Sequence, residues 1–339
     1  MRRPPARRGG ARGPGRPAAS FVKWVGSKQG VLSAILARMA PPTGRYFEPM
    51  VGSGVVFLGL APERAVLGDA NAELVDCYRV IRDDVEALVR ALDRHVNTRE
   101  HFLAVRAQRP EDLPPVERAA RFIFLNKTCF NGLYRVNAAG AFNVPYGGIA
   151  HANFRDAATL RRVSARLEGV SLRCADVAEC VRDAGPGDLV YLDPPYFAAP
   201  RAEVRYRAQG FGVEGHERLA ALFDDLDRRG CRVVLSNADA PEVRALYRGR
   251  VVEVLATRRP VNRDARARDG WRELLIRNYD DPPRSSPPAA PLAVATPSAS
   301  AAQALDALVE RFVEDLRGLA AELARQSIAK VAQTRRDDS

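Results

Sequence analysis

The motif Asp193, Pro194, Pro195 and Tyr196 follows directly after a run of apolar residues at 189–192. An amine on an aromatic ring is a poor nucleophile because its lone pair is delocalised, and two acceptors on its hydrogens would free that lone pair. The Asp193 carboxylate can be one acceptor and the Pro194 carbonyl the other, on a backbone that the next proline stiffens. Tyr196 offers a face on which an extruded base can stack. The motif suits group transfer to a base amine, although any proline-stiffened loop could show it.

A glycine turn near the start of the chain forms a second candidate site, in the sequence FEPMVGSG at 47–54. Gly52 and Gly54 would let backbone amides approach a ligand closely. Asp69 lies fifteen residues beyond Gly54, where an acid at a strand end can bind both ribose hydroxyls. Phe57 stands where a dinucleotide fingerprint has its third glycine, which speaks against a pyrophosphate and a nicotinamide dehydrogenase. The pattern predicts a nucleoside-type cofactor without phosphates.

Both motifs must be positioned by strands. Strand, glycine turn, helix, strand and acid in that order are typical of the opening of a nucleotide-binding α/β sheet. The last two expected strands would form an antiparallel edge. Periodicity and breakers predict helices at 28–39, 54–60 and 214–229, and strands at 45–50, 64–68, 169–173, 188–192, 231–236, about 250–256 and 271–278.

The segment between the second and third of these strands has a different residue pattern. Residues 71–168 are mostly helical and polar, with a passage rich in glycine and asparagine at 131–148. No alternation of strands and helices is visible there. We therefore expect an α/β fold that carries a helical insertion at about 75–165.

Charge is concentrated at the N-terminus. The chain has a formal net charge of +11, and six arginines with no acidic residue in residues 1–19 leave +5 for the rest. Residues 1–19 contain almost no large apolar side chain, so we expect a disordered basic tail. A mildly basic body with such a tail fits a polyanionic partner, although base usage in the genome would also enrich arginine.

Membrane, secretory and metal-binding classes find no support in the sequence. No run of about 18 apolar residues and no signal-peptide pattern is present, so we expect a cytoplasmic protein. The five cysteines form no C-x-x-C pair and read as reduced thiols. The four histidines are scattered, and we expect no metal site. The cysteines and histidines are Cys77, Cys129, Cys174, Cys180, Cys231, His95, His101, His151 and His216.

The C-terminal part has its own organisation. Residues 281–300 are rich in proline, serine and alanine and read as a linker. Residues 301–339 read as an amphipathic helix with an apolar stripe that needs a partner. Docking of the stripe on the chain's own domain, and thus a monomer, is favoured, and a dimer through this helix is the alternative.

Taken together and in this order, the motifs resemble those of the Dam-type, or D12-class, N6-adenine DNA methyltransferases. The resemblance covers about 20–280 and implies a Rossmann-like S-adenosylmethionine-dependent methyltransferase sheet with an inserted helical DNA-recognition domain. The matching segments are FVKWVGSK at 21–28, EPMVGSG at 48–54, GDAN at 68–71, FLNKTCFNGLYRVNAAGAFNVPYG at 124–147, YLDPPY at 191–196, LSNAD at 235–239 and ELLIRNY at 273–279.

The resemblance also implies a cofactor site. Trp24 and Lys28 would hold the methionine portion of S-adenosylmethionine, and Asp69 would bind its ribose. The residues that would line its pocket are Glu48, Gly52 and Gly54. The family has Asp-Phe beside the adenine of the cofactor where this chain has Asp-Val, which offers less stacking surface. The two residues beside the adenine are Asp176 and Val177.

The segment 124–147 resembles the part of these enzymes that reads DNA. The resemblance associates Asn131, Leu133 and Arg135 with DNA contact, with Phe130 and Leu133 as wedges into the base stack and Lys23 close to DNA. Arginine is well suited to guanine O6 and N7 in the major groove. From spacing alone, an ordinary turn at Asn131 and a core aromatic at Phe130 would be the simpler interpretations.

The implied reaction is direct in-line transfer of a methyl group to the N6 amine of an adenine extruded from double-stranded DNA, without a covalent enzyme intermediate. The recognition site would resemble GATC, and a partner nuclease in a restriction-modification system is compatible with the sequence. Methylation of cytosine N4, an RNA substrate and a DNA-binding module that has lost catalysis are the rival interpretations.

Overall fold

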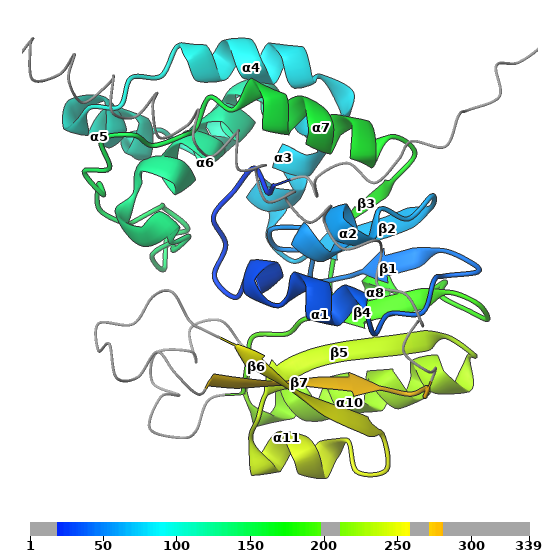
Figure 1. Cartoon of the computed structure of the whole chain (residues 1–339). Coiled ribbons are helices and arrows are strands. Elements are labelled where there is room, and N and C mark those ends of the chain that lie inside the picture. Colours follow the sequence, from blue (N-terminus) through cyan, green and yellow to red (C-terminus); the bar gives the residue numbers. More distant parts are fainter. Residues whose placement is uncertain (1–18, 198–210, 258–270, 281–339) are drawn as a thin grey trace, which may run out of the picture. The chain divides into compact units, whose positions relative to one another are not determined.

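The computed structural model describes residues 19–197, 211–257 and 271–280 (Figure 1). Residues 1–18 of the predicted tail, the predicted linker at 281–300 and the predicted C-terminal helix at 301–339 lie outside these ranges, so their expected structures are not tested. None of the helices in the described part is long and apolar enough to cross a bilayer.

The described strands form one seven-stranded sheet with the order β3-β2-β1-β4-β5-β7-β6. Pairing is parallel from β3 to β5, and β7 runs antiparallel to both of its neighbours. The strands are β1 Tyr46–Glu48, β2 Ala65–Asp69, β3 Ser171–Cys174, β4 Leu189–Leu192, β5 Arg232–Ala238, β6 Val251–Thr257 and β7 Trp271–Arg277. The order of β3 to β5 is that of a doubly wound α/β sheet, whose switch point lies between β1 and β4.

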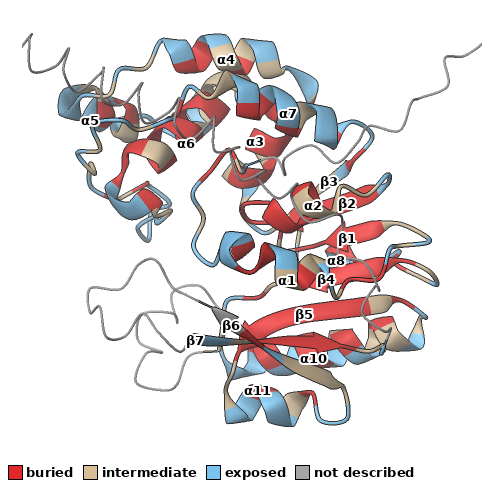
Figure 2. Ribbon diagram, in the orientation of Figure 1, coloured by how far each residue is buried: buried red, intermediate tan, exposed pale blue. Residues whose placement is uncertain are grey.

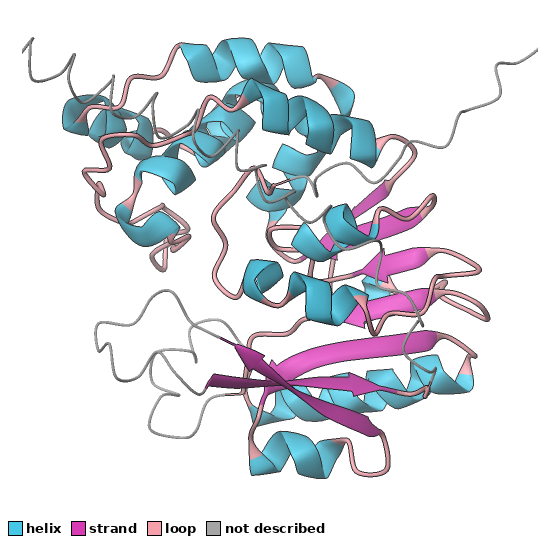
Figure 3. Cartoon of the chain, viewed as in Figure 1, coloured by secondary structure: helices cyan, strands magenta, loops and turns pink. Residues whose placement is uncertain are grey.

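Helices cover the sheet and extend beyond β3 (Figure 3). The α-helices are α1 Leu32–Leu36, α2 Val55–Leu60, α3 Ala72–Asp83, α4 Val85–Asp93, α5 Arg99–Ala107, α6 Pro115–Thr128, α7 Ala157–Leu167, α8 Val177–Cys180, α10 Val213–Arg228 and α11 Pro241–Leu246. Short 3-10 turns are η1 Lys28–Gly30, η2 Pro110–Asp112 and η3 Phe130–Gly132.

Successive strand residues face two different apolar layers, as the period of two in a strand requires. In β4, Leu189 and Tyr191 face the layer that contains residues of α1 to α7, whereas Val190 and Leu192 face the layer built with α10 and α11. All four residues are buried, and β5 is also buried over most of its length (Figure 2). The central strands are therefore held from both faces, which fixes their register.

In the chain, five α-helices, α3 to α7, follow β2 and precede β3 (Figure 1). Helix α3 contacts both of these strands and also packs on α6 and α7, whereas α5 packs on α6. The side chains of Asn71, Asp84, Thr98 and Asp156 cap four of the five helices by accepting a backbone N–H. The chain thus leaves the sheet after β2 and returns to it at β3, and the segment between these strands contains helices and no strand of the sheet.

The α/β class, the seven strands and the antiparallel edge are confirmed. The expected helix at 28–39 is wrong, because only η1 and the short α1 form there. Val31 lies between them with φ −123° and ψ 7°, outside the helical region, and α1 ends five residues before Pro41. Gly54 caps α2 in the left-handed conformation and does not belong to the helix.

Candidate active site

The register of the sheet brings three polar residues together at the carboxyl ends of β1, β4 and β5. Phe47 pairs with Val190, and Leu192 pairs with Leu235. One step further, Glu48 lies beside Tyr191 and Asp193 lies beside Ser236. This is the switch point of the sheet, where ligands bind in folds of this kind.

Asp193 is held through both of its carboxylate oxygens. Its Oδ2 lies 2.7 Å from the ammonium of Lys28, and its Oδ1 accepts a hydrogen bond of 2.9 Å from Ser236 Oγ. Lys28 is buried, with 3% of its side chain exposed, and it also donates to the carbonyl of Gly26 at 2.5 Å. The charge of a buried ammonium is thus compensated by the aspartate of the sequence motif.

Tyr196 belongs to the same cluster. Its hydroxyl donates to Glu273 Oε2 at 2.8 Å, and the Lys28 ammonium lies 4.7 Å from the centre of its ring. Burial raises the pKa of the Tyr196 hydroxyl well above its usual range, so it stays protonated. Pro194 is buried and Pro195 is exposed, so the motif turns from the interior towards solvent within two residues.

The glycine turn packs against aromatic rings. Gly52 has φ +46° and Gly54 has φ +65°, in the left-handed region that favours glycine. A Cβ on Gly52 would lie 2.6 Å from the indole of Trp24, and a Cβ on Gly54 would lie 2.5 Å from the hydroxyl of Tyr78. That hydroxyl donates to the Gly52 carbonyl at 3.0 Å. Both glycines are therefore required by conformation and by space.

Asp69 connects the glycine turn to the end of β2. Its Oδ2 accepts from Gly52 N at 3.1 Å and its Oδ1 from Asn71 N at 2.9 Å. Burial raises the pKa of Asp69 in spite of these amides. Asp176 and Val177 follow the end of β3, the neighbour of β2, where Asp176 caps α8 by accepting from Ala178 N.

Glu48 lies beneath this surface, with only 3% of its area exposed. Its Oε2 accepts from the Tyr46 hydroxyl at 2.7 Å and from Phe57 N at 2.9 Å. Burial raises the pKa of Glu48 to about 8, and the nearby Asp193 adds to the shift. Glu48 is thus a buried acid behind the amine site.

Lys23 and the turn at Phe130–Gly132 lie side by side. A Cβ on Gly132 would lie 2.4 Å from the side chain of Lys23, so the lysine packs directly on the glycine. The amide of Asn126 joins the two segments. It accepts from Lys23 N at 2.8 Å, donates to Lys23 O at 2.8 Å and donates to Gly132 O at 3.1 Å.

The other residues predicted to contact DNA lie on or beside this turn. Phe130 is 49% exposed, and Asn131 is exposed with φ +55°. Leu133 is only partly buried and packs against the core. Arg135 is exposed, and its Nε donates to Asn143 Oδ1 at 2.7 Å. The structure therefore brings Lys23 to the turn and leaves Phe130 and Asn131 accessible.

Trp24 lies between the glycine turn and the turn at Phe130–Gly132. Its ring stacks on Tyr134 with centroids 5.8 Å apart, lies 6.3 Å from the ring of Phe122, and packs against Gly52 of the glycine turn. Tyr134 in turn donates to Glu73 Oε1 at 2.8 Å. The segment from Lys23 to Lys28 therefore connects the turn at Phe130–Gly132 with Asp193.

The comparison with known families decides what this arrangement belongs to. A sequence model described as D12 class N6 adenine-specific DNA methyltransferase matches residues 24–260. The chain belongs to this family. The match spans the segment from Trp24 through β6 and so includes Asp193 and the glycine turn, whereas Lys23 and Glu273 lie outside it. The predicted family, the Rossmann-like α/β fold and adenine-specific methylation of DNA are confirmed, whereas a separate DNA-recognition domain stays a prediction.

Three relatives of this methyltransferase show how far the similarity extends. The type II methyltransferase M1.LlaDCHI of Lactococcus lactis subsp. cremoris is 35% identical over 269 residues, which cover 76% of this chain and 95% of the relative. The type II methyltransferase M.MjaIII of Methanocaldococcus jannaschii is 33% identical, over 76% and 98%. The DNA adenine methylase of Escherichia coli (strain K12) is 30% identical, over 76% and 94%.

Sequence reasoning missed several residues that hold the methyltransferase site together. It did not single out Asn126, Tyr191, Ser236 or Glu273, although each lies inside or beside a motif that carries the family resemblance. The alternation of side chains in a strand places Tyr191 and Asp193 on one face. That spacing could have indicated Tyr191, whereas the partners on other elements require the register.

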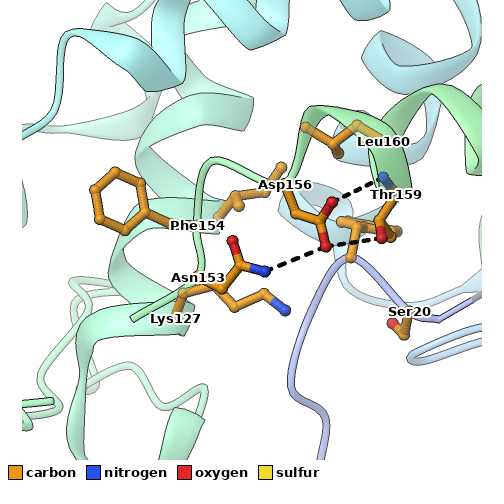
Figure 4. A pocket seen from close by; sticks show the side chains of 9 residues that line it. Ser20, Lys127, Asn153, Phe154, Asp156, Thr159 and Leu160 are labelled. Carbon is orange, nitrogen blue, oxygen red and sulfur yellow. Dashed lines mark hydrogen bonds between the residues drawn. The ribbon is translucent and has the colours of Figure 1, made fainter. Parts of the chain in front are cut away.

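A separate small cavity lies away from the amine site, between α6, the start of α7 and the segment at Ser20 (Figure 4). Its volume is about 20 Å³, which is enough for about one water molecule. Lys127 and Asp156 are among its lining residues, and burial lowers the pKa of Lys127. A cavity of this size does not hold a nucleoside. Among the described residues, no group of three or more histidines, cysteines and acids is arranged to hold a metal.

Proposed function

We propose that this methyltransferase moves a methyl group from S-adenosylmethionine to the N6 amine of an adenine extruded from double-stranded DNA, with Asp193 at the centre of the amine site. The observation that carries the proposal is the position of the Asp193 carboxylate. It lies at the switch point of the sheet, held by Lys28 and Ser236, beside the glycine turn. A methyl donor bound at the turn and an amine bound at Asp193 would be neighbours.

The residues at this edge fit S-adenosylmethionine. The two left-handed glycines leave a backbone without Cβ atoms. A carboxylate accepts about four hydrogen bonds, so Asp69 retains capacity for a ribose hydroxyl beside the amides of Gly52, Ala70 and Asn71. An ammonium has three hydrogens, and Asp193 and Gly26 engage two of those on Lys28. The remaining one can bind the carboxylate of the methionine portion.

In this proposal the cofactor lies along the carboxyl edge. Lys28 and Trp24 hold the methionine portion, and Asp69 holds the ribose. Glu48, Gly52 and Gly54 line the pocket, with Asp176 and Val177 beside the adenine. The support for Glu48 is electrostatic, because its carboxyl interacts with both Lys28 and Asp193 from beneath. When bound, S-adenosylmethionine supplies the methyl group on its sulfonium.

The protein's own part is to hold the adenine amine in a reactive geometry. Asp193 accepts one N6 hydrogen on a lone pair that Lys28 and Ser236 leave free. The Pro194 carbonyl accepts the other on a stiff backbone, and no described residue donates to it. Tyr196 presents its ring to the base while Glu273 holds its hydroxyl. Positioning of this kind supplies a large share of the rate enhancement in bimolecular transfers.

The turn at Phe130–Gly132 and its neighbours would contact DNA. Phe130 is an exposed aromatic ring that can enter a base stack, and Leu133 supports it from the partly buried side. Lys23 and Asn131 lie at the same turn, and Arg135 can reach a guanine if it exchanges its contact with Asn143. We propose GATC as the first candidate site, and a monomer acting in the cytoplasm.

The test is single-molecule sequencing with modification detection on DNA from a methylation-deficient host that expresses this chain. The Asp193→Ala variant, expressed to the same soluble level, is the inactive control. We expect N6-methyladenine in one short motif with the wild-type chain and none with the variant. Modified cytosine N4 would replace the proposal by the cytosine reaction. DNA binding by soluble protein without any modified base would identify a binding module that has lost catalysis.

A further inference from the structure

We infer that Ser236 and Tyr191 are positioning residues for the methyl transfer, and that they form a buried hydrogen-bonded relay that fixes the orientation of the Asp193 carboxylate. The inference rests on the proposed function of Asp193 as the acceptor of the adenine amine. Neither residue touches the substrates in this proposal. They act through Asp193 alone.

The contacts of the relay are short, and its two hydroxyls are buried. Ser236 Oγ donates to Asp193 Oδ1 at 2.9 Å, and the hydroxyls of Tyr191 and Ser236 lie 2.8 Å apart. Ser236 is 1% exposed and Tyr191 is 0% exposed. Water therefore does not replace either hydroxyl, and the Tyr191 hydroxyl depends on Ser236 for its hydrogen bond.

The direction of the relay follows from counting hydrogens. As a carboxylate paired with the Lys28 ammonium, Asp193 can only accept. The single hydroxyl hydrogen of Ser236 is therefore used on Asp193, and its oxygen must accept from the hydroxyl of Tyr191. Burial raises the pKa of Tyr191 well above its usual range, so that hydroxyl keeps its hydrogen. The relay runs from Tyr191 through Ser236 to Asp193, and each bond polarises the next.

The register of the sheet makes this arrangement unavoidable once β4 and β5 pair. Tyr191 and Asp193 are two residues apart and face the same side of β4. Tyr191 pairs with Val234, so Ser236 on β5 lies beside Asp193 on that same side. The relay is thus built into strands that are buried on both faces.

Rotation of the carboxylate is blocked by contacts at both ends. Turning it would break the bond from Ser236 at Oδ1 and the ion pair with Lys28 at Oδ2 together. Asp193 lies just beyond the end of β4, where the strand no longer restrains the side chain. The relay supplies the missing restraint and directs the free lone pairs of Asp193 outward. An acceptor fixed before the adenine arrives needs no reorganisation during the reaction.

The experiment compares Ser236→Ala, Ser236→Thr and Tyr191→Phe in the full-length chain, by steady-state transfer from tritiated S-adenosylmethionine to methylation-free DNA. We expect kcat of Ser236→Ala to fall at least about tenfold, as for loss of a hydrogen bond to a charged group. Its KM values for DNA and cofactor should stay within about twofold. Ser236→Thr keeps the hydroxyl and should recover most of kcat. Tyr191→Phe should lower kcat about threefold.

The double variant Ser236→Ala, Tyr191→Phe separates a relay from two independent structural effects. Once Ser236 is gone, the Tyr191 hydroxyl cannot reach Asp193, so kcat should equal that of Ser236→Ala alone. Tyr247→Phe is the matched control for tyrosine, because the Tyr247 hydroxyl is buried without a hydrogen-bond partner among the described residues. Its kcat should match the wild type.

Three results would overturn the relay. One is a Ser236→Ala variant with kcat within about twofold of the wild type, and the other is a loss that falls on a KM instead. Equal losses in Ser236→Thr and Ser236→Ala would also contradict it, because they would trace the effect to packing. These outcomes require an active wild-type chain, whereas a wild-type chain that transfers no methyl group at all would contradict the proposed function itself.

Discussion

Asp193 and its partners come from strands whose register is fixed by neighbours on both sides, whereas Phe130 and Asn131 lie on a short exposed turn. At the amine site, each polar group is held by buried side chains from a different strand or segment, including Lys28, Ser236 and Tyr191. At the turn, one buried amide, that of Asn126, holds both the lysine segment and Gly132. A fixed geometry suits a reaction that is the same at every site. An accessible turn suits contact with DNA, since binding residues often lie on loops that a rigid scaffold positions.

Removal of the central carboxylate is the most severe way to break the first region. We expect Asp193→Ala to retain cofactor binding and to lose more than about nine-tenths of its transfer activity, equivalent to more than about 1.4 kcal/mol. Activity is measured by tritium transfer and cofactor binding by calorimetry. Asp183→Ala is the control, because the exposed Asp183 carboxylate pairs with Arg45 and Arg173 and not with Lys28 or Ser236. Retention of more than a tenth of the activity in Asp193→Ala would remove Asp193 from the catalytic role.

Burial of Glu48 predicts that the amine site limits stability at neutral and alkaline pH. The pKa of Glu48 is about 8 in the folded chain against 4.5 for the free group. Between these values the folded chain holds a proton that the unfolded chain has lost, so stability falls as pH rises from about 4.5 to about 8. Glu48→Gln removes this dependence and should raise the unfolding free energy by about 3 kcal/mol at pH 7.

The measurement is urea unfolding of both chains at several pH values. Glu253→Gln is a control of the opposite sign, because the hydrogen bond from Arg38 lowers the pKa of Glu253. The stability that Glu253 contributes is present above the pKa of the free group and is lost as pH falls through the folded value. Parallel curves for the wild type and Glu48→Gln from pH 5 to pH 8 would show that Glu48 is not a buried neutral acid.

Asn126 allows the second region to be loosened without touching the first. Asn126→Ala removes three hydrogen bonds and leaves the Lys23 and Gly132 backbone groups without their partner, at a cost of about 2 kcal/mol in stability. Because Asp193 and its partners are unchanged, we expect KM for DNA to rise about tenfold while kcat changes less than threefold.

Asn278→Ala is the matched control for this change. The Asn278 amide accepts from Val233 N and donates to Asp227 and to Cys231 O, so it also makes three bonds, but at the far edge of the sheet. It should lose similar stability in thermal unfolding and keep its KM for DNA. Equal KM values in the two variants would show that the turn does not depend on Asn126.

The two regions also differ in how well the sequence predicts them. The pattern of apolar residues and the turn-forming residues between them predict the seven strands. The positions of Gly54, Asp69 and Asp193 after three of these strands place all three residues at the carboxyl ends of the strands. The helix expected at 28–39 fails, since apolar spacing does not reveal that Val31 leaves the helical region. That segment instead brings Lys28 to Asp193, a contact between residues 165 positions apart.

Contacts set by register are the main part that the sequence leaves open. Ser236 meets Asp193 only because Leu192 pairs with Leu235, and a shift of one residue would turn the serine to the other face. Asn126 is equally hidden, because a buried amide in an apolar helix gives no sign of which backbone groups it will bind. Motif order therefore predicts the chemistry of the site, and tertiary pairing determines what holds it.

Deletion of the basic tail should have the smallest effect, which we expect on the salt dependence of DNA binding. Its charge is known from the sequence alone, with six arginines in residues 1–19. If these side chains bind phosphates, their deletion lowers the slope of log affinity against log salt by about 0.9 for each phosphate that the tail neutralises. The site in the DNA that is methylated should not change, because the amine site and the turn remain.

Filter binding from low to moderate salt measures the slope, and a tail with glutamine in place of all six arginines controls for length. An unchanged slope would show that these six arginines neutralise no phosphates of the DNA.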